Sequence, residues 1–165
     1  MQGDSGVISA LNELLAGELT AADQYFVHAR MYEDWGYQAL YEKAEHERQE
    51  EIDHADWLIR RILFLGGTPD LATRQPLNVG HDVPSMLRND LDLEYAVVEH
   101  LRRVIALCES AGDAVTRELL EKLLDDTERD HTHWLEKQLH LIDSMGLANY
   151  LQLRTHDHGG GDAGG

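Results

Sequence analysis

Two Glu-x-x-His pairs, Glu51 with His54 and Glu128 with His131, are the residues of this sequence best suited to metal chemistry. Residues three apart lie on one face of a helix, so each pair presents a carboxylate beside an imidazole. This combination suits iron or manganese, and zinc also binds to it. A single such pair on an acidic helix more often belongs to a solvated surface, so the surrounding sequence has to decide.

The surrounding sequence favours a buried site, because acids and histidines interrupt the apolar stripe of every long predicted helix. The interrupting residues are Glu18 in the helix predicted over 6–35, Glu47, Glu51 and His54 in 37–65, Glu94 in 83–111, and Glu128 and His131 in 114–145. An unpaired buried carboxylate is costly. Four carboxylates, one from each helix, that converge with two histidines therefore need a shared cation.

The order of these residues repeats in the two halves of the chain. Glu18 precedes Glu51 by 33 residues, and Glu94 precedes Glu128 by 34, so each half supplies a lone Glu and then a Glu-x-x-His. Two pseudo-equivalent hairpins would pack these residues into a roughly two-fold site. Four carboxylates balance the charge of two Fe(II) ions, and histidines bind as neutral imidazoles, so the sequence indicates a pair of metal ions.

The connections between the predicted helices indicate an all-α four-helix bundle. Gly36 and Gly112 end the first and third helices, so two short loops join antiparallel neighbours. The stretch from 66 to 82 is long enough to cross the length of a bundle, as in two hairpins joined by one long crossover. A short fifth helix is predicted over 147–154. The Gly- and His-rich tail, 155–165, is predicted to be disordered.

The composition restricts the possible partners and the compartment. The chain has 165 residues and a formal net charge of −17, which disfavours nucleic acid and anionic membranes as partners. Cys108 is the single cysteine, which indicates a reducing compartment and excludes zinc ribbons and iron–sulfur clusters built from one chain. The sequence has no signal-peptide pattern and no apolar run long enough to span a bilayer. We therefore expect a cytoplasmic protein.

Several runs of the sequence resemble bacterioferritin over residues 1–154. These runs are Met1-Gln2-Gly3-Asp4, Gln24-Tyr25-Phe26-Val27-His28-Ala29-Arg30-Met31, Trp35-Gly36, His54-Ala55-Asp56, Arg61-Ile62-Leu63-Phe64-Leu65, Asp90-Leu91, His133-Trp134-Leu135-Glu136 and Met145-Gly146-Leu147-Ala148-Asn149-Tyr150-Leu151-Gln152. The resemblance implies a ferritin-like di-iron domain, residues 1–154, whose ligand set is a lone Glu and a Glu-x-x-His from each half.

The resemblance also implies a function and roles for individual residues. A bacterioferritin stores iron in a shell of 24 subunits and oxidises Fe(II) with O2 or H2O2 at a ferroxidase site that holds two iron ions per subunit. The ligands then fall on Glu18, Glu51, His54, Glu94, Glu128 and His131. In that family Glu51 and Glu128 bridge the two ions. A tyrosine at the place of Tyr25 lies beside the site and supplies an electron, and a ferredoxin-type reductant is an expected partner.

Two further positions bear on iron and haem. His46 and Glu50 match positions where the family holds an iron ion at the inner surface. Haem b in this family is bound at a two-fold interface by one methionine from each subunit, and Ile52 occupies the matching position. Isoleucine has no lone pair with which to bind iron, so we expect no haem held in this way. Ile52 fits the haem-poor subunit of a shell that also contains a haem-binding bacterioferritin subunit.

Two other functions stay open at this point. A di-iron peroxidase of the rubrerythrin kind would use the same ligands without storing iron, but it normally carries a cysteine-rich module that one cysteine cannot build. A purely structural bundle with zinc as a filler is the second alternative. The extent and speed of Fe(II) oxidation by the metal-free protein distinguish these functions from ferroxidase storage.

Overall fold

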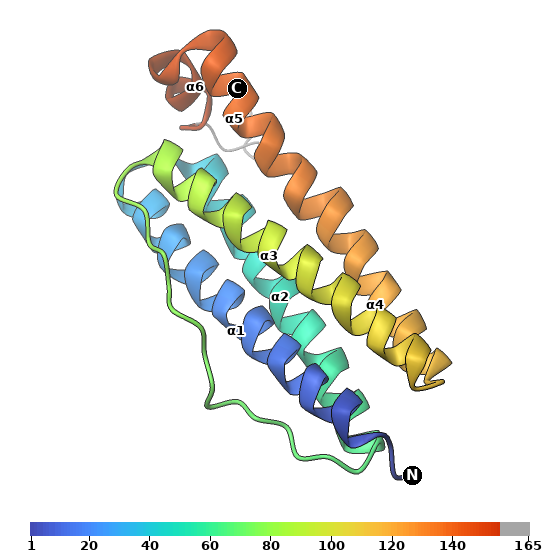
Figure 1. Cartoon of the computed structure of the whole chain (residues 1–165). Helices are drawn as coiled ribbons and strands as arrows, with labels where there is room; N and C mark the ends of the chain where they lie inside the picture. The colour runs from blue at the N-terminus through green and yellow to red at the C-terminus, as the bar shows by residue number, and fades with distance from the viewer. Residues whose placement is uncertain (156–165) are drawn as a thin grey trace, which may run out of the picture.

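The computed structural model describes residues 1–155 and consists of helices that form an elongated bundle (Figure 1). The α-helices are α1 (Ser5–Asp34), α2 (Gln38–Phe64), α3 (Val83–Ser110), α4 (Ala114–Asp126), α5 (His133–Met145) and α6 (Leu147–Leu153). A π-helical segment, Thr127–Thr132, joins α4 to α5, so these three segments together form the fourth long helix. The predicted all-α bundle with a short fifth helix at its end is confirmed. The predicted tail, including His156 and His158, lies outside the described residues apart from Thr155.

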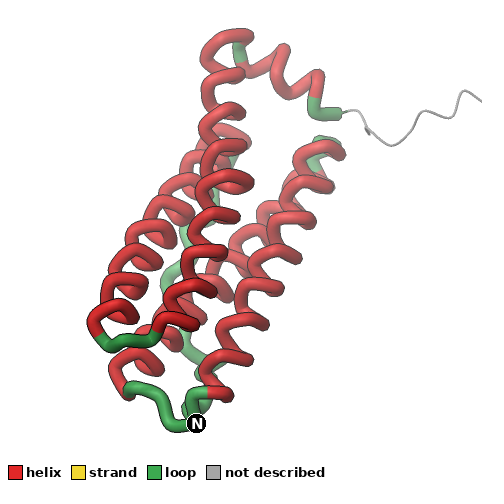
Figure 2. The backbone as a smooth tube through the Cα atoms, turned by 90° about the vertical axis from the view of Figure 1, so that its right-hand side faces the viewer, coloured by secondary structure: helices red, strands yellow, loops and turns green. Residues whose placement is uncertain are grey.

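Two antiparallel hairpins make up the bundle. α1 packs along α2, and α3 packs along α4 and α5, with Gly36 and Gly112 in the connecting turns. Both glycines have positive φ, 85° and 71°, in the left-handed region that other residues rarely adopt. Figure 2 shows the helices running side by side along the long axis, with α6 turned back at one end.

The connection between the hairpins runs along the outside of α1, as Figure 1 shows in green. Polar residues of α1 bind its backbone at successive levels. Asn12 bonds to Thr68 and Asp70, the hydroxyl of Thr20 accepts from the Gln75 N–H, Gln24 accepts from the Asn78 N–H, and His28 Nε2 accepts from the Gly80 N–H. The long crossover expected from the sequence is therefore fixed to one helix along most of its length.

The start of α3 is fixed where the crossover ends. The Asp82 side chain accepts from the Ser85 backbone N–H, and the Ser85 hydroxyl accepts from the Asp82 N–H in return. This reciprocal pair satisfies N–H groups that have no partner within the helix. Pro84 in the first turn requires no N–H partner there. Together they fix where α3 begins relative to α1.

Two apolar clusters fill the interior and leave a polar layer between them. One includes Leu11, Leu15, Leu58, Leu101 and Leu120, and lies toward the N-terminal end of α1. The other includes Tyr32, Leu40, Leu87, Leu135 and Tyr150, at the end that carries α6. All the interrupting acids and histidines except Glu128 are buried between these clusters, near mid-length of the helices. Burial of the two clusters stabilises the helices that hold this polar layer in place.

The fourth helix differs from the continuous α-helix predicted over 114–145, because residues 127–132 form a π-helical turn. Such turns are rare in proteins, and those that occur are often found at functional sites. This one contains both Glu128 and His131. Among residues 1–155, the structure has no helix that is both long enough and apolar enough to cross a membrane.

Candidate metal centre

Five of the six ligands predicted from the sequence converge in the polar layer. Glu18 from α1, Glu51 and His54 from α2, Glu94 from α3 and His131 from the π-helical turn are each at most 3% exposed. Side chains from all four long helices therefore meet in the interior. We call these five residues the buried cluster.

The buried cluster has two centres, each of which has the donor atoms for a metal ion. Potential ligand atoms of Glu18, Glu51 and His54 lie within 4.8 Å of one another, and so do those of Glu51, Glu94 and His131. Glu51 belongs to both groups. His131 Nδ1 is 2.8 Å from Glu51 Oε1 and 3.1 Å from Glu94 Oε1, while His54 Nδ1 is 3.6 Å from Glu18 Oε2.

Several buried oxygens of the cluster have no hydrogen-bond partner. Within the described part of the chain, these are both carboxylate oxygens of Glu18, both of Glu51, and Oε2 of Glu94. Leaving a charged buried group unsatisfied costs more than a kilocalorie per mole, so such groups are rare in folded proteins. Several together, with imidazoles between them, are what a cation site requires.

The electrostatics of the cluster have the same implication. Burial, and after it the charge of Glu51, raises the pKa of Glu18 from 4.5 to about 8. Burial lowers the pKa of His54, but the nearby carboxylates of Glu18 and Glu51, 3.6 and 3.7 Å from its Nδ1, outweigh this effect and raise it to about 11. The pKa of His131 is also raised, because the charge of Glu94 and contacts with Glu47, Glu50 and Glu51 outweigh burial. In the metal-free protein, protonated imidazoles neutralise the carboxylates of the cluster. A bound metal ion would neutralise the same carboxylates in their place.

Glu47 is a buried acid of this layer that was not among the ligands predicted from the sequence. It is 2% exposed, and its Oε2 lies 2.6 Å from His131 Nε2. Lys43, one turn away, forms an ion pair with Glu47. The signal was present in the sequence, because Glu47 also interrupts the apolar stripe of α2. The structure therefore places four carboxylates in the interior of this layer, counting Glu47.

Glu128, the sixth predicted ligand, lies outside the buried cluster. Its side chain is 44% exposed, and its Oε1 is 2.7 Å from an Arg102 guanidinium nitrogen. The expectation that Glu128 faces the core beside His131 therefore differs from the structure. The reason is the π-helical turn, whose wider loop rotates the chain less per residue, so residues three apart no longer share a face.

Tyr25 lies beside the cluster, as expected. Its hydroxyl donates to Glu94 Oε1 at 2.7 Å, and the side chain is 3% exposed. Burial and the charge of Glu94 raise the pKa of this phenol well above 10. Tyr25 is therefore a protonated phenol in direct contact with one of the predicted ligands.

Comparison with known proteins agrees with this geometry. A model of the ferritin-like domain matches residues 8–145. The chain is 58% identical over 158 residues to the bacterial ferritin of Paramagnetospirillum magnetotacticum, covering 95% of this chain and 96% of that one. It is 54% identical over 152 residues to the bacterial ferritin of Synechocystis sp., covering 92% and 97%. The chain belongs to the ferritin family.

More distant relatives extend the family assignment. The bacterioferritin of Brucella melitensis is 41% identical over 155 residues, covering 94% of this chain and 96% of that protein. The resemblance inferred from the sequence runs is thereby confirmed. The match spans nearly the whole chain, so the buried cluster of this ferritin lies inside the region shared with its relatives.

Two other positions singled out in the sequence are on α2 of this ferritin. His46 and Glu50 are in contact, with His46 Nε2 2.8 Å from Glu50 Oε1, and Glu47 completes a group of potential ligand atoms within 4.8 Å. A hydrogen bond with His131 lowers the pKa of Glu50 to about 2. Ile52 is 38% exposed and presents an aliphatic side chain at the surface of α2.

Proposed function

We propose that this ferritin oxidises Fe(II) at the buried cluster and stores the ferric product. The observation that supports the proposal is the cluster itself, with three carboxylates and two imidazoles buried between apolar layers and with unpaired oxygens. Iron is the substrate here, and it supplies the electrons when it passes from Fe(II) to Fe(III). The protein holds two ions close enough for a two-electron step, with ligands that tolerate both valences.

Two iron ions per subunit fit the two overlapping groups of ligand atoms. Glu18 with His54 would hold one ion, Glu94 with His131 the other, and Glu51 would bridge them. We assign the remaining ligand to Glu128, as the second bridging carboxylate. That role requires Glu128 to exchange Arg102 for metal, and an exposed ion pair of this kind contributes only about 0 to 1 kcal/mol.

Metal binding replaces protons at this site. Neighbouring carboxylates raise the pKa of His54 and of His131, so both imidazoles are protonated in the metal-free protein. Each imidazole has to become neutral to bind a metal ion. Binding of iron therefore releases these protons and also the proton that Glu18, with its pKa of about 8, holds at pH 7. The divalent charge then neutralises Glu18, Glu51 and Glu94 in place of the released protons.

A second iron position is proposed at His46 and Glu50. Glu50 also contacts His131, with Oε2 2.6 Å from His131 Nε2, and its side chain is 28% exposed. Glu47 contacts both sites, because it belongs to the group of ligand atoms with His46 and Glu50 and its Oε2 also lies 2.6 Å from His131 Nε2 in the buried cluster. This arrangement supports transfer of iron or electrons between the surface of α2 and the buried cluster.

The assembly proposed is a shell of 24 subunits, either of this chain alone or mixed with a haem-binding bacterioferritin subunit. Ile52 at the surface of α2 offers no ligand for haem b, which supports the role of a haem-poor subunit in a mixed shell. The oxidant is O2 or H2O2, and a ferredoxin-type protein is the proposed reductant for iron release. The proposed location is the cytoplasm.

The test is to mix metal-free protein with Fe(II) in air and to follow ferric absorbance. We expect a rapid phase of about two ions per chain, followed by mineral growth far beyond that ratio. Glu94→Ala and His131→Ala should lose the rapid phase while the shell still assembles. Glu109→Ala, an exposed acid of the same helix, is the matched control and should behave as wild type. Rapid oxidation by both site variants would show that the site is misassigned, and saturation near two ions would indicate a peroxidase.

A further inference from the structure

Four aromatic rings form a row that crosses the bundle through the buried cluster. The ring centroids of Trp57 and His54 are 5.7 Å apart. Those of His54 and His131 are 5.9 Å apart, and the two planes are nearly parallel at 17°. Tyr25 meets His131 edge-on at 6.4 Å. The row therefore connects both imidazoles of the site to one further aromatic side chain at each end.

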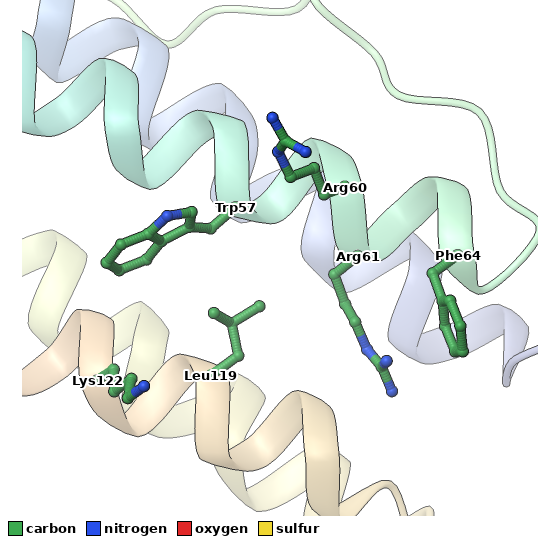
Figure 3. Close-up of a pocket in the computed structure, with 6 residues that line it drawn as sticks. All are labelled: Trp57, Arg60, Arg61, Phe64, Leu119 and Lys122. Atoms are coloured by element: carbon green, nitrogen blue, oxygen red, sulfur yellow. The ribbon is translucent and has the colours of Figure 1, made fainter.

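The two ends of the row differ in their access to water. Tyr25 is buried and hydrogen-bonded to Glu94, whereas Trp57 is 37% exposed. Figure 3 shows the Trp57 indole extending from α2 toward α4, where it lines a pocket of about 350 Å³ together with Leu119 and Phe64. Trp57 is thus the member of the row that connects the site to the solvent.

The charges around Trp57 affect what this indole does when it loses an electron. The pocket it lines includes Arg60, Arg61 and Lys122, of which Arg60 is paired with Asp56 and Arg61 with Asp113. The positive charge of Lys122 disfavours a radical cation by Coulomb repulsion. Loss of an electron is therefore coupled to loss of the indole N–H proton, for which the exposed pocket offers water as the acceptor.

A site that holds one iron ion has a chemical difficulty with peroxide. Reduction of H2O2 to two molecules of water consumes two electrons and two protons, and a single Fe(II) supplies only one electron. The alternative to a second electron is release of a hydroxyl radical. We propose that Trp57 is a one-electron relay that supplies the second electron and is restored by a ferrous ion outside the site. This inference rests on the proposed ferroxidase function.

The electrons and protons of the two steps balance. In the first, Fe(II), Trp57, H2O2 and one proton from water give Fe(III), a neutral Trp57 radical and two molecules of water, since the indole contributes one electron and its N–H proton. In the second, the radical takes one electron from a further Fe(II) and one proton from water. The sum is two Fe(II), H2O2 and two protons converted to two Fe(III) and two molecules of water.

The experiment loads metal-free protein with one Fe(II) per chain without oxygen, adds H2O2, and freezes samples for electron paramagnetic resonance. Protein grown with ring-deuterated tryptophan should give a narrowed organic radical signal. Trp57→Phe should lose the part of this signal that tryptophan deuteration narrows, as distinct from any Tyr25 radical, and should release more hydroxyl radical to a spin trap. Trp35→Phe is the matched control, because Trp35 is 38% exposed and is outside the row, and it should keep the signal.

A conservative variant separates loss of the relay from loss of the fold. Trp57→Tyr restores an oxidisable ring, so we expect a radical that tryptophan deuteration does not narrow, and hydroxyl radical release as low as in wild type. An unchanged signal in Trp57→Phe, or equal loss in Trp35→Phe, would overturn the relay. Wild-type protein that oxidises Fe(II) no faster than buffer would instead contradict the proposed function, and the relay with it.

Discussion

Replacement of Glu18 by Gln tests whether buried charge destabilises the metal-free protein. Glu18 is 1% exposed, and its pKa is about 8 against an ordinary value of 4.5. At pH 7 folding has to protonate a carboxyl group that is ionised in the unfolded chain, at a cost of about 3 kcal/mol. Gln resembles the protonated acid in shape and carries no charge. Glu18→Gln should therefore stabilise the metal-free protein by up to about this amount.

The sign of the pH dependence follows from the raised pKa. Below pH 4.5 the carboxyl is protonated in both states, so wild type and Glu18→Gln should be equally stable. Between pH 4.5 and 8 the folded state binds the proton and the unfolded state does not, so wild-type stability falls as pH rises. Above pH 8 the difference reaches its full size, about 5 kcal/mol as an upper bound, and stays constant.

The assay is thermal unfolding of the metal-free protein at a series of pH values. For a chain of this length, about 3 kcal/mol corresponds to a rise in Tm of roughly 6 to 12 °C at pH 7. Glu109→Gln, at an exposed position, should leave Tm unchanged at every pH. A Tm for Glu18→Gln at or below that of wild type across pH 5 to 9 would refute the electrostatic reasoning.

Three further predictions follow from contacts of the site and the crossover. Zinc added to metal-free protein at pH 7 in weak buffer should acidify the solution, since His54 and His131 release protons, and His131→Gln should release fewer in the same titration. Arg102→Gln frees Glu128 from an exposed ion pair, so it should raise zinc affinity in calorimetry by no more than about fivefold. His28→Ala removes the contacts of this buried ring with Asp90 and the Gly80 N–H, and should cost about 2 to 4 kcal/mol in denaturant unfolding.

Much of the site could be predicted from the sequence, because helical periodicity fixes which residues share a face. Glu18, Glu51 and Glu94 stand where an apolar residue is expected, and the structure buries all three between two apolar clusters. The length of the segment between the hairpins likewise predicted a crossover. These features depend on local spacing, which a sequence displays directly.

The features that were missed depend on departures from regular helix and on contacts between helices. No spacing rule signals the π-helical turn, so Glu128 was expected in the core, while the structure pairs it with Arg102. Glu47 interrupts a stripe as clearly as Glu51 does, but its contact with His131 is made across the bundle. Trp57 follows His54 by three residues, so the sequence places the two on one face of α2. The direction of the Trp57 ring, however, depends on how α2 faces α4.

The central claim is that iron binds where buried carboxylate oxygens otherwise lack a hydrogen-bond partner. A crystal of the protein soaked in Fe(II) without oxygen, measured on both sides of the iron absorption edge, tests this directly. We predict two anomalous peaks in the buried cluster, one beside Glu18 and His54 and one beside Glu94 and His131, with Glu51 between them. A cluster without anomalous density at saturating Fe(II), with the metal found only on the exposed acids, would contradict the account.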